Sequence, residues 1–323
     1  MALPDFFVVG APKAGTTALH GALARHPQLF MSPVKEPKFF LCDGPPPTQG
    51  GPGDAHSYRE WIWRGDDYER LFAAAPASAL KGESTPLYLA DPRAVERIHD
   101  AVPAARIIVI LRDPVDRAYS NWAHLWADGL EPIDSFTAAC AEEENRKQAG
   151  WAPFWRYREI GLYGQQLSHL YSVFPREQVL VLRYMWLVEE PQRTLDTVCR
   201  FLGVEEGILD EAPAQNVGTY VPPTRVTRLL QSTMRAGAAV GRHFPPKVWR
   251  KVSIPLLFLL QRAPEHRPEL APEDRAHLLD YFVEDITVVE ELTGWDLSAW
   301  RTYRPGGTYS VRKSWAPSRR LAS

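Results

Sequence analysis

The chain has 323 residues, of which 45% are hydrophobic and 11 are tryptophan, and its formal net charge at pH 7 is −2. This composition favours a packed core over wholesale disorder, and the near-neutral charge gives no overall attraction to nucleic acids or acidic membranes. The three cysteines are odd in number and far apart, which argues against a disulfide framework or a metal cluster and favours a reducing compartment.

The sequence also gives no sign of membrane insertion. Its N-terminus lacks the basic and apolar regions of a signal peptide. The longest apolar run, residues 254–260, is far shorter than the roughly 20 residues that span a bilayer. We therefore expect a soluble, cytoplasmic protein.

Apolar runs and helical patterns alternate along the chain. Continuous apolar runs are typical of strands buried on both faces, and strands are expected at residues 5–10, 77–83, 106–114 and 178–184. Helices are expected at residues 16–25, 94–101, 115–126, 162–173 and 192–202, the last ending at Gly203. This alternation predicts an α/β fold with an open, mostly parallel sheet of the P-loop type, flanked by helices.

We expect a single domain over residues 1–303. A Gly/Pro-rich stretch at about 43–54 reads as a flexible inserted loop within that domain. The tail at 304–323 combines Arg and Lys with Gly, Pro and Ser and is expected to be a flexible basic end.

The first predicted strand leads into a loop with the outline of a phosphate-binding turn, "GAPKAGTT". Backbone N–H groups between Gly10 and Gly15, with a helix N-terminus behind them, can form an anion-binding concavity. The Walker pattern has Lys directly after the second Gly, followed by the Ser or Thr that binds magnesium. Here Thr16 occupies the lysine position and Lys13 lies inside the loop, where it can stabilise charge on a departing phosphate oxygen. The alternative is a tight turn with a solvent-facing lysine.

A second candidate segment is "LRDPVDRAYSNW". Arg112 ends a predicted buried strand, which is where ligands bind in doubly wound sheets. Ser120 lies two turns along the following helix, so Arg112 and Ser120 can converge on a further phosphate. Two alternatives remain open. Arg112 can pair with Asp113 or Asp116, or Asp113 can bind magnesium as a Walker B aspartate.

Together these segments resemble the two cofactor signatures of sulfotransferases that use 3′-phosphoadenosine-5′-phosphosulfate (PAPS). "APKAGTT" resembles the 5′-phosphosulfate loop, and "RDPVDRAYS" resembles the 3′-phosphate motif, with Arg and Ser eight positions apart. The likeness continues through "HPQLFMSPVKEPKFF", "KGESTPLYL" and "DYFVEDITVVEELTGWDLSAW". Within the superfamily the chain is most similar to the heparan sulfate N- and 3-O-sulfotransferases and their bacterial relatives. PAPS chemistry needs no magnesium, which explains the early lysine.

The resemblance implies the donor site. The 5′-phosphosulfate would be held by Lys13, Ala14, Gly15, Thr16 and Thr17, and Lys13 would stabilise the departing phosphate oxygen. The 3′-phosphate would be bound by Arg112 and Ser120. Relatives also carry a late segment that closes over the nucleotide; here it corresponds loosely to 216–225, so Tyr220 and Arg225 are candidates for the 3′-phosphate or adenine. No metal is implied.

The resemblance also implies a catalytic base, the glutamate just before a Phe-Phe pair, which is Glu36 in "KEPKFF". A base is physically required because an acceptor hydroxyl is a poor nucleophile until its proton is taken. The alternative for Glu36 is a salt bridge to Lys35 or Lys38. Glu83, in "GESTP", is the second candidate base, or it holds Lys13 or Lys38 in place. Lys38 is a candidate contact for the moving sulfonate.

One feature is not explained by the resemblance. Residues 212–264 contain no Asp or Glu but several Arg and Lys among apolar residues, with a basic helical segment expected at about 222–264. Through residues 225–262 such a segment can contact a membrane surface or an anionic acceptor. The alternative is a solvated helical lid packed on the sheet.

Three functions stay in view. The first is transfer of a sulfuryl group from PAPS to a hydroxyl or amine of a glycan, a lipid or a small molecule, with no nucleic acid involved. The second is a magnesium-dependent P-loop kinase, against which Thr16 argues. The third is a nucleotide-binding module without catalysis, against which Lys13 and Glu36 argue. The sequence leaves the acceptor and the oligomeric state open.

Overall fold

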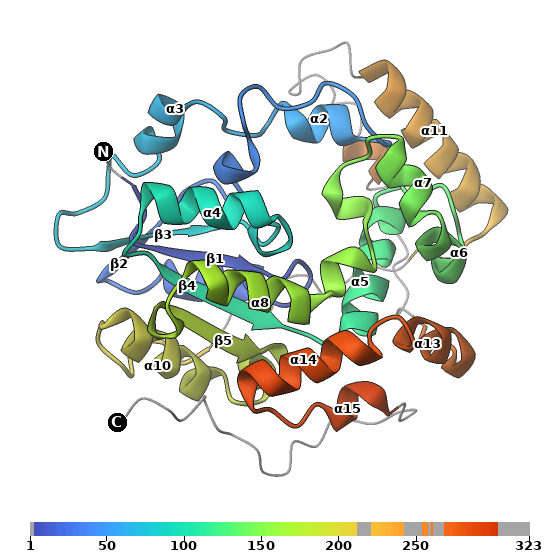
Figure 1. Ribbon diagram of the computed structural model, residues 1–323. Coiled ribbons are helices and arrows are strands. Elements are labelled where there is room, and N and C mark those ends of the chain that lie inside the picture. The colour runs from blue at the N-terminus through green and yellow to red at the C-terminus, as the bar shows by residue number, and fades with distance from the viewer. Residues whose placement is uncertain (1–2, 212–220, 242–253, 258–259, 261–267, 303–323) are drawn as a thin grey trace.

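The computed structural model describes residues 3–211, 221–241, 254–257, 260 and 268–302. Its centre is a five-stranded sheet in the order β2-β3-β1-β4-β5, and every neighbouring pair is parallel. The strands are β1 (Phe6–Gly10), β2 (Leu29–Met31), β3 (Leu80–Ser84), β4 (Arg106–Leu111) and β5 (Val179–Arg183). The predicted α/β class and parallel sheet are therefore confirmed (Figure 1).

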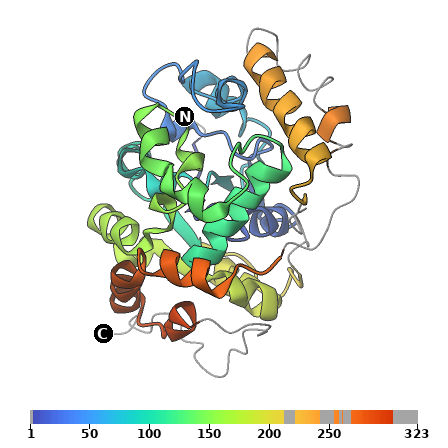
Figure 2. The same cartoon turned by 90° about the vertical axis from the view of Figure 1, so that its right-hand side faces the viewer.

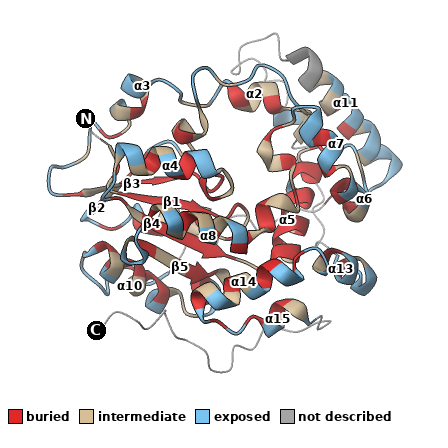
Figure 3. Ribbon diagram, viewed as in Figure 1, coloured by how far each residue is buried: buried red, intermediate tan, exposed pale blue. Residues whose placement is uncertain are grey.

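Helices cover both faces of this sheet. In Figure 1, α4 (Pro92–Ala101) and α8 (Tyr163–Val173) lie in front of the strands, and α14 (Val283–Thr293) packs against α8. Figure 2 shows α1 (Thr16–Leu23), in dark blue, on the opposite side of the strands from α8. This explains why β1 and nearly all of β4 are buried, as the red strands of Figure 3 show.

Further helices and short turns complete the described part of the fold. The helices are α2 (Asp54–Tyr58), α3 (Gly65–Arg70), α5 (Pro114–Ala127), α6 (Phe136–Ala141), α7 (Glu143–Gln148), α9 (Tyr184–Glu189), α10 (Pro191–Leu202), α11 (Arg225–Gly241), α13 (Pro272–Leu279) and α15 (Ser298–Arg301). Short 3-10 turns are η1 (Phe39–Leu41), η2 (Tyr88–Ala90), η3 (Pro153–Trp155), η4 (Glu159–Gly161) and η5 (Arg176–Gln178). None of the helices in the described residues is long and apolar enough to cross a membrane.

The parallel register brings the predicted motifs to one edge. Val8 of β1 is paired with Ser84 of β3 on one side and with Ile108 of β4 on the other, and Leu111 of β4 is paired with Arg183 of β5. Since the carboxyl ends of parallel strands point the same way, the loops after β1, β3, β4 and β5 emerge together. This is the edge at which the candidate site is built.

Candidate active site

The loop after β1 is shaped as an anion-binding turn. Gly15 has φ 91° and immediately precedes α1, whose first turn carries no side-chain cap among the described residues. By contrast, Asp91 caps α4 and Asp113 caps α5. The amide of Ala11 donates to the carbonyl of Ile110 over 2.8 Å, which fixes the loop to β4. The N-terminus of α1 is therefore available to a ligand's negative charge.

Two lysines of the predicted site have unusual backbones. Among the described residues other than glycine, only Lys13 (φ 66°) and Lys38 (φ 63°) lie in the left-handed region. Such conformations cost of the order of 1 kcal/mol or more and concentrate at functional sites. The two strained residues are thus both ones that the sequence put forward for catalysis.

Arg112 joins the two phosphate-binding segments. It follows β4, and its Nη1 donates to the carbonyl oxygen of Lys13 over 3.3 Å. Its guanidinium lies 5.1 Å from the ring centre of Tyr184, which also packs beside Gly15: a Cβ there would be 2.8 Å from that ring. The Nε of Arg112 is buried and has no hydrogen-bond partner in the described part of the chain. This donor is therefore available to an anionic ligand.

The alternative partners of Arg112 are engaged elsewhere. Asp113 accepts from the amides of Val115 and Asp116 at the start of α5, and it forms a buried ion pair with Arg275 of α13. Asp116 pairs with the same Arg275 over 2.9 Å. Burial raises the pKa of Asp113 to about 6, and Asp116 adds to the shift while Arg275 opposes it. Asp113 is therefore a helix cap and a structural anchor.

Glu36 lies in the loop that precedes η1, between two cations. Lys35 Nζ is 3.4 Å from its Oε1 and Lys38 Nζ is 3.9 Å from its Oε2, so both predicted salt bridges occur. The side chain of Glu36 keeps 29% of its surface exposed, so the salt bridges leave it open to an acceptor. Lys38 Nζ also lies 5.3 Å from the ring centre of Trp61. The first candidate base and Lys38 are thus adjacent.

Glu83, the second candidate base, has a different setting. It is fully buried near the end of β3, where Thr85 Oγ1 donates to Oε1 over 2.6 Å and the Tyr68 hydroxyl donates to Oε2. Burial raises the pKa of Glu83 to about 7, although the hydrogen bonds from Thr85 and Tyr68 oppose that shift. Both oxygens of this carboxyl are already occupied by protein donors.

Comparison with solved structures decides the family. The chain is similar to "Crystal Structure of Sulfotransferase from Alicyclobacillus acidocaldarius", with a TM-score of 0.72 and 31% sequence identity, covering 94% of this chain and 100% of that one. The chain belongs to the sulfotransferase family. The model of the sulfotransferase family also matches residues 51–207, a range that contains Glu83, Arg112 and Ser120 but not Lys13 or Glu36.

Vertebrate sulfotransferases show the same relationship at greater distance. Human heparan sulfate glucosamine 3-O-sulfotransferase 6 is 29% identical over 211 residues, which cover 64% of this chain and 54% of that protein. Human bifunctional heparan sulfate N-deacetylase/N-sulfotransferase 3 is 29% identical over 219 residues, covering 62% of this chain and 22% of that protein. The chain thus spans about half the length, or less, of these curated relatives.

Two titratable residues that respond to the charge of Lys13 were not put forward from the sequence. His124 and Asp128 follow Ser120 at four-residue steps along α5, and His124 Nε2 lies 3.7 Å from Asp128 Oδ2. Burial, with a smaller contribution from Lys13, lowers the pKa of His124 to about 4, and burial raises the pKa of Asp128 to about 6 against the effect of Lys13. The pair therefore faces the phosphate loop. The spacing of four from Ser120 was the available signal.

The late candidates contribute less. Tyr220 lies outside the described residues. Arg225 is exposed at the first position of α11, and in the described part of the chain it makes no hydrogen bond or ion pair with Lys13, Arg112 or Ser120. Its role, like those of the other proposed contacts, stays a prediction.

The basic segment is helical where the structure describes it. Its α11 packs on the end of α5, where Gln231 donates to the carbonyl of Trp126 over 2.8 Å and Arg228 pairs with Asp134 over 2.6 Å. The helix therefore covers α5 and not the sheet, at the edge of the molecule in Figure 2. Val226 and Leu229 remain 66% and 69% exposed on its outer side.

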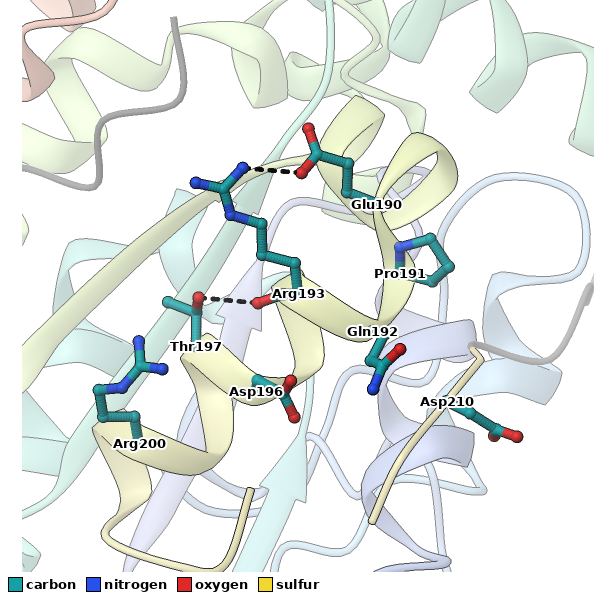
Figure 4. Close-up of a pocket in the computed structure, with 8 residues that line it drawn as sticks. All are labelled: Glu190, Pro191, Gln192, Arg193, Asp196, Thr197, Arg200 and Asp210. Carbon is teal, nitrogen blue, oxygen red and sulfur yellow. Dashed lines mark hydrogen bonds and ion pairs between the residues drawn. The ribbon is translucent and has the colours of Figure 1, made fainter. Parts of the chain in front are cut away.

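The largest pocket among those described is not the candidate site. It has a volume of about 640 Å³ and lies on α10 (Figure 4). Its polar groups are partly paired with one another: Arg193 bonds to Glu190, and Thr197 donates to the carbonyl of Arg193. None of the predicted site residues lines it.

Proposed function

We propose that this protein is a sulfotransferase that moves a sulfuryl group from PAPS to a hydroxyl or amine of an acceptor. The single observation that carries the proposal is the bond from Arg112 to the carbonyl of Lys13. It joins the loop after β1 and the end of β4 into one anion-binding edge. Family membership supports the reaction class.

The residues present fit a doubly phosphorylated nucleotide. The uncapped N-terminus of α1, with Lys13, Ala14, Gly15, Thr16 and Thr17, would hold the 5′-phosphosulfate. The buried Nε of Arg112, which lacks a protein partner among the described residues, would donate to the 3′-phosphate. Ser120, on the next helix, would add a hydroxyl to the same phosphate.

The proposed chemistry is divided between residues that would contact the acceptor and residues that would contact the donor. When bound, PAPS supplies an activated sulfuryl group whose bond to the 5′-phosphate oxygen is broken as the acceptor bond forms. Glu36 would accept the proton of the acceptor hydroxyl, and its exposure beside Lys35 and Lys38 suits a carboxylate that must meet a substrate. Lys13 would stabilise the negative charge that develops on the phosphate oxygen, and Lys38 would contact the sulfonate.

The acceptor proposed is a glycan, or a lipid or small molecule that bears a sugar. The names of the curated relatives, which include a heparan sulfate glucosamine 3-O-sulfotransferase and "Carbohydrate sulfotransferase 15" from Homo sapiens, support a carbohydrate.

Residues 225–262 are proposed to contact an anionic acceptor or a membrane surface, supported by exposed Val226 and Leu229. Undiminished binding of Val226→Ser/Leu229→Ser to anionic vesicles and to heparan sulfate would remove this part of the proposal.

A magnesium-dependent kinase is the second candidate, and the setting of Asp113 counts against it. That carboxylate would have to bind the metal, but it caps α5 and is paired with Arg275 in a buried site. A non-catalytic nucleotide-binding module is also disfavoured, because strained backbones at Lys13 and Lys38 have no evident use in it.

Ligand-dependent thermal unfolding tests the proposal. A ligand that binds only the native state raises its stability by mass action. We expect the product nucleotide, adenosine 3′,5′-bisphosphate, to raise the Tm, with little effect of AMP. In Arg112→Ala the rise should vanish, whereas in Arg193→Ala, a matched change on the far surface of α10, it should persist.

The comparator is ATP with magnesium. A rise in Tm with ATP and magnesium but not with the bisphosphate would overturn the proposal and revive the kinase. Transfer of labelled sulfate from PAPS to heparan sulfate or to a small glycoside then tests the acceptor, with Glu36→Gln expected to lower kcat by about 100-fold or more.

A further inference from the structure

A buried hydrogen-bond relay links β3 to the loop that carries Glu36 and Lys38. At its base is Glu83, fully buried, with Thr85 and Tyr68 donating to its two carboxyl oxygens. Thr85 Oγ1 in turn accepts a hydrogen bond from the backbone amide of Lys38 over 3.3 Å. The carboxyl therefore orients the one hydroxyl that fixes Lys38, a residue whose left-handed backbone needs external support.

The same cluster clamps the residues that follow Lys38. Phe39 stacks on Tyr68 with ring centres 4.2 Å apart and planes 9° apart. The amide of Phe40 donates to the hydroxyl of Tyr88 over 3.2 Å, and the rings of Phe40 and Tyr88 meet edge to face. Tyr68, which bonds Glu83, thus also forms the platform for η1. Hydrogen bonds and ring contacts converge on one short loop.

A backbone hydrogen bond also ties this loop to the segment after α2. The amide of Ile62 donates to the carbonyl of Pro37 over 3.0 Å, so the segment after α2 runs against the segment between Glu36 and Lys38. Within the described residues, the Glu36 side chain is paired with Lys35 and Lys38 and does not bond to this frame. Its position therefore depends on the backbone to either side, which the relay fixes.

We propose that Glu83 is a positioning residue, which holds the loop of Glu36 and Lys38 in place through Thr85 and Tyr68 and does not itself take the acceptor proton. This inference rests on the proposed function, in which Glu36 is the base. Glu83 cannot meet an acceptor, because its side chain is fully enclosed and both its oxygens already accept bonds from protein hydroxyls.

The ionisation of Glu83 fits this role. The titratable groups that face it are Tyr68 of α3, Tyr88 of η2 and Glu36. Burial, with a smaller contribution from Glu36, raises its pKa to about 7. The ionised carboxylate accepts from both hydroxyls, whereas the protonated carboxyl must turn one oxygen into a donor and so disturbs the orientation of Thr85. The relay should therefore loosen as the pH falls below about 7.

Amide hydrogen exchange, which needs no knowledge of the acceptor, tests the relay. Exchange over a peptide covering residues 34–42 would be followed by mass spectrometry in Glu83→Gln and Thr85→Val. We expect at least about 10-fold faster exchange in both, because the Lys38 amide loses an oriented acceptor. Thr85→Ser keeps the hydroxyl and should restore protection. Thr197→Val removes a hydroxyl that bonds only within α10 and is the matched control.

Kinetics separate a positioning residue from a base. We expect Glu83→Gln and Thr85→Val each to lower the rate of transfer from PAPS to heparan sulfate by about 10- to 100-fold, with the double variant no slower than the slower single variant, because both act through one relay. The affinity for adenosine 3′,5′-bisphosphate should be kept in both variants. If Thr85→Val behaves as wild type while Glu83→Gln is inactive, Glu83 is the base and the inference is wrong.

The two proposals fail in different ways. Unchanged exchange in both variants would overturn the relay even if the wild-type protein binds the bisphosphate and transfers sulfate. Failure of the wild type to bind the bisphosphate would instead overturn the proposed function, while faster exchange in the two variants would still establish that Glu83 and Thr85 fix this loop.

Discussion

At the scale of single residues, charged groups of the candidate site act on one another between separate elements. Lys13 depresses the pKa of His124, and Lys35 does the same to His20, in each case after burial as the larger cause. Both imidazoles are thereby neutral at pH 7, with pKa values of about 4. A neutral imidazole at His124 therefore adds no second positive charge near Lys13.

This coupling gives a direct test of where the Lys13 ammonium points. Lys13→Met should raise the pKa of His124 above about 4, and the value should stay below 6.5 because burial remains. The pKa of His20 should not respond to this change but should rise in Lys35→Met. NMR titration of the imidazole Cε1 resonances measures both. An unchanged His124 pKa would mean that the ammonium is directed away from α5.

At the scale of elements, the phosphate loop depends on a glycine for two reasons. Gly15 has φ 91°, and a Cβ there would lie 2.8 Å from the ring of Tyr184. Gly44 has φ 102° but nothing within 4 Å of its Cβ position. An alanine at Gly44 therefore suffers the backbone strain without the steric clash, and comparing it with an alanine at Gly15 measures the clash. Ala at either position costs about 1–2 kcal/mol through the backbone. At Gly15 the clash with Tyr184 adds a further cost.

We therefore expect Gly15→Ala to lower the free energy of unfolding by about 1–3 kcal/mol more than Gly44→Ala. It should also weaken binding of adenosine 3′,5′-bisphosphate, since Tyr184 supports the Arg112 guanidinium. Urea unfolding and calorimetric titration of the two variants measure these effects. Equal destabilisation by both substitutions would show that Tyr184 yields without cost.

The same elements show what a sequence can predict and what it cannot. β1, β4 and β5 were predicted because continuous apolar runs mark strands buried on both faces, and α10 was bounded by Gly203, which has φ 68°. β2 has three residues, and α2 and α3 have five and six, too few for a hydrophobic period to appear.

In the candidate site, it was easier to predict which loops lie close together than which side chains form ion pairs or hydrogen bonds. Lys13 and Arg112 follow neighbouring parallel strands, so their proximity was implied by the fold. The ion pair between Asp113 and Arg275 joins residues far apart in the chain and has no local signature. The burial of Glu83 was likewise hidden, because its polar surroundings in "GEST" gave no sign that β3 lies inside the sheet.

At the scale of the whole molecule, several groups whose pKa values are shifted by desolvation make stability depend on pH in opposite directions. Burial raises the pKa of Glu83 to about 7 and those of Asp113 and Asp128 to about 6. Such carboxyls bind more protons in the folded than in the unfolded state, so stability falls as the pH rises through this range. His20 and His124 have lowered pKa values and act in the opposite sense. The pH dependence of the free energy of unfolding of the wild type is therefore a sum of opposing contributions.

A variant isolates the contribution of Glu83. Its pKa is raised from 4.5 to about 7, so its contribution is fully present below pH 4.5 and is lost as the pH rises through 7. Glu83→Gln removes this titration. The stability of wild type relative to Glu83→Gln should fall by up to about 3 kcal/mol between these limits, whereas any lost hydrogen bond adds only a constant offset.

Urea unfolding at a series of pH values from 4.5 to 8 measures the difference, with exposed Glu177→Gln as the matched control for removing one carboxyl. A pH-independent difference between wild type and Glu83→Gln would mean that Glu83 titrates alike in the folded and unfolded states. It would then not be enclosed as described, and Glu83 would again be a candidate for the base. If the stability of wild type relative to Glu83→Gln falls towards neutral pH, the enclosed carboxyl is retained at a cost in stability. This is expected where orienting Lys38 and Glu36 matters more than stability.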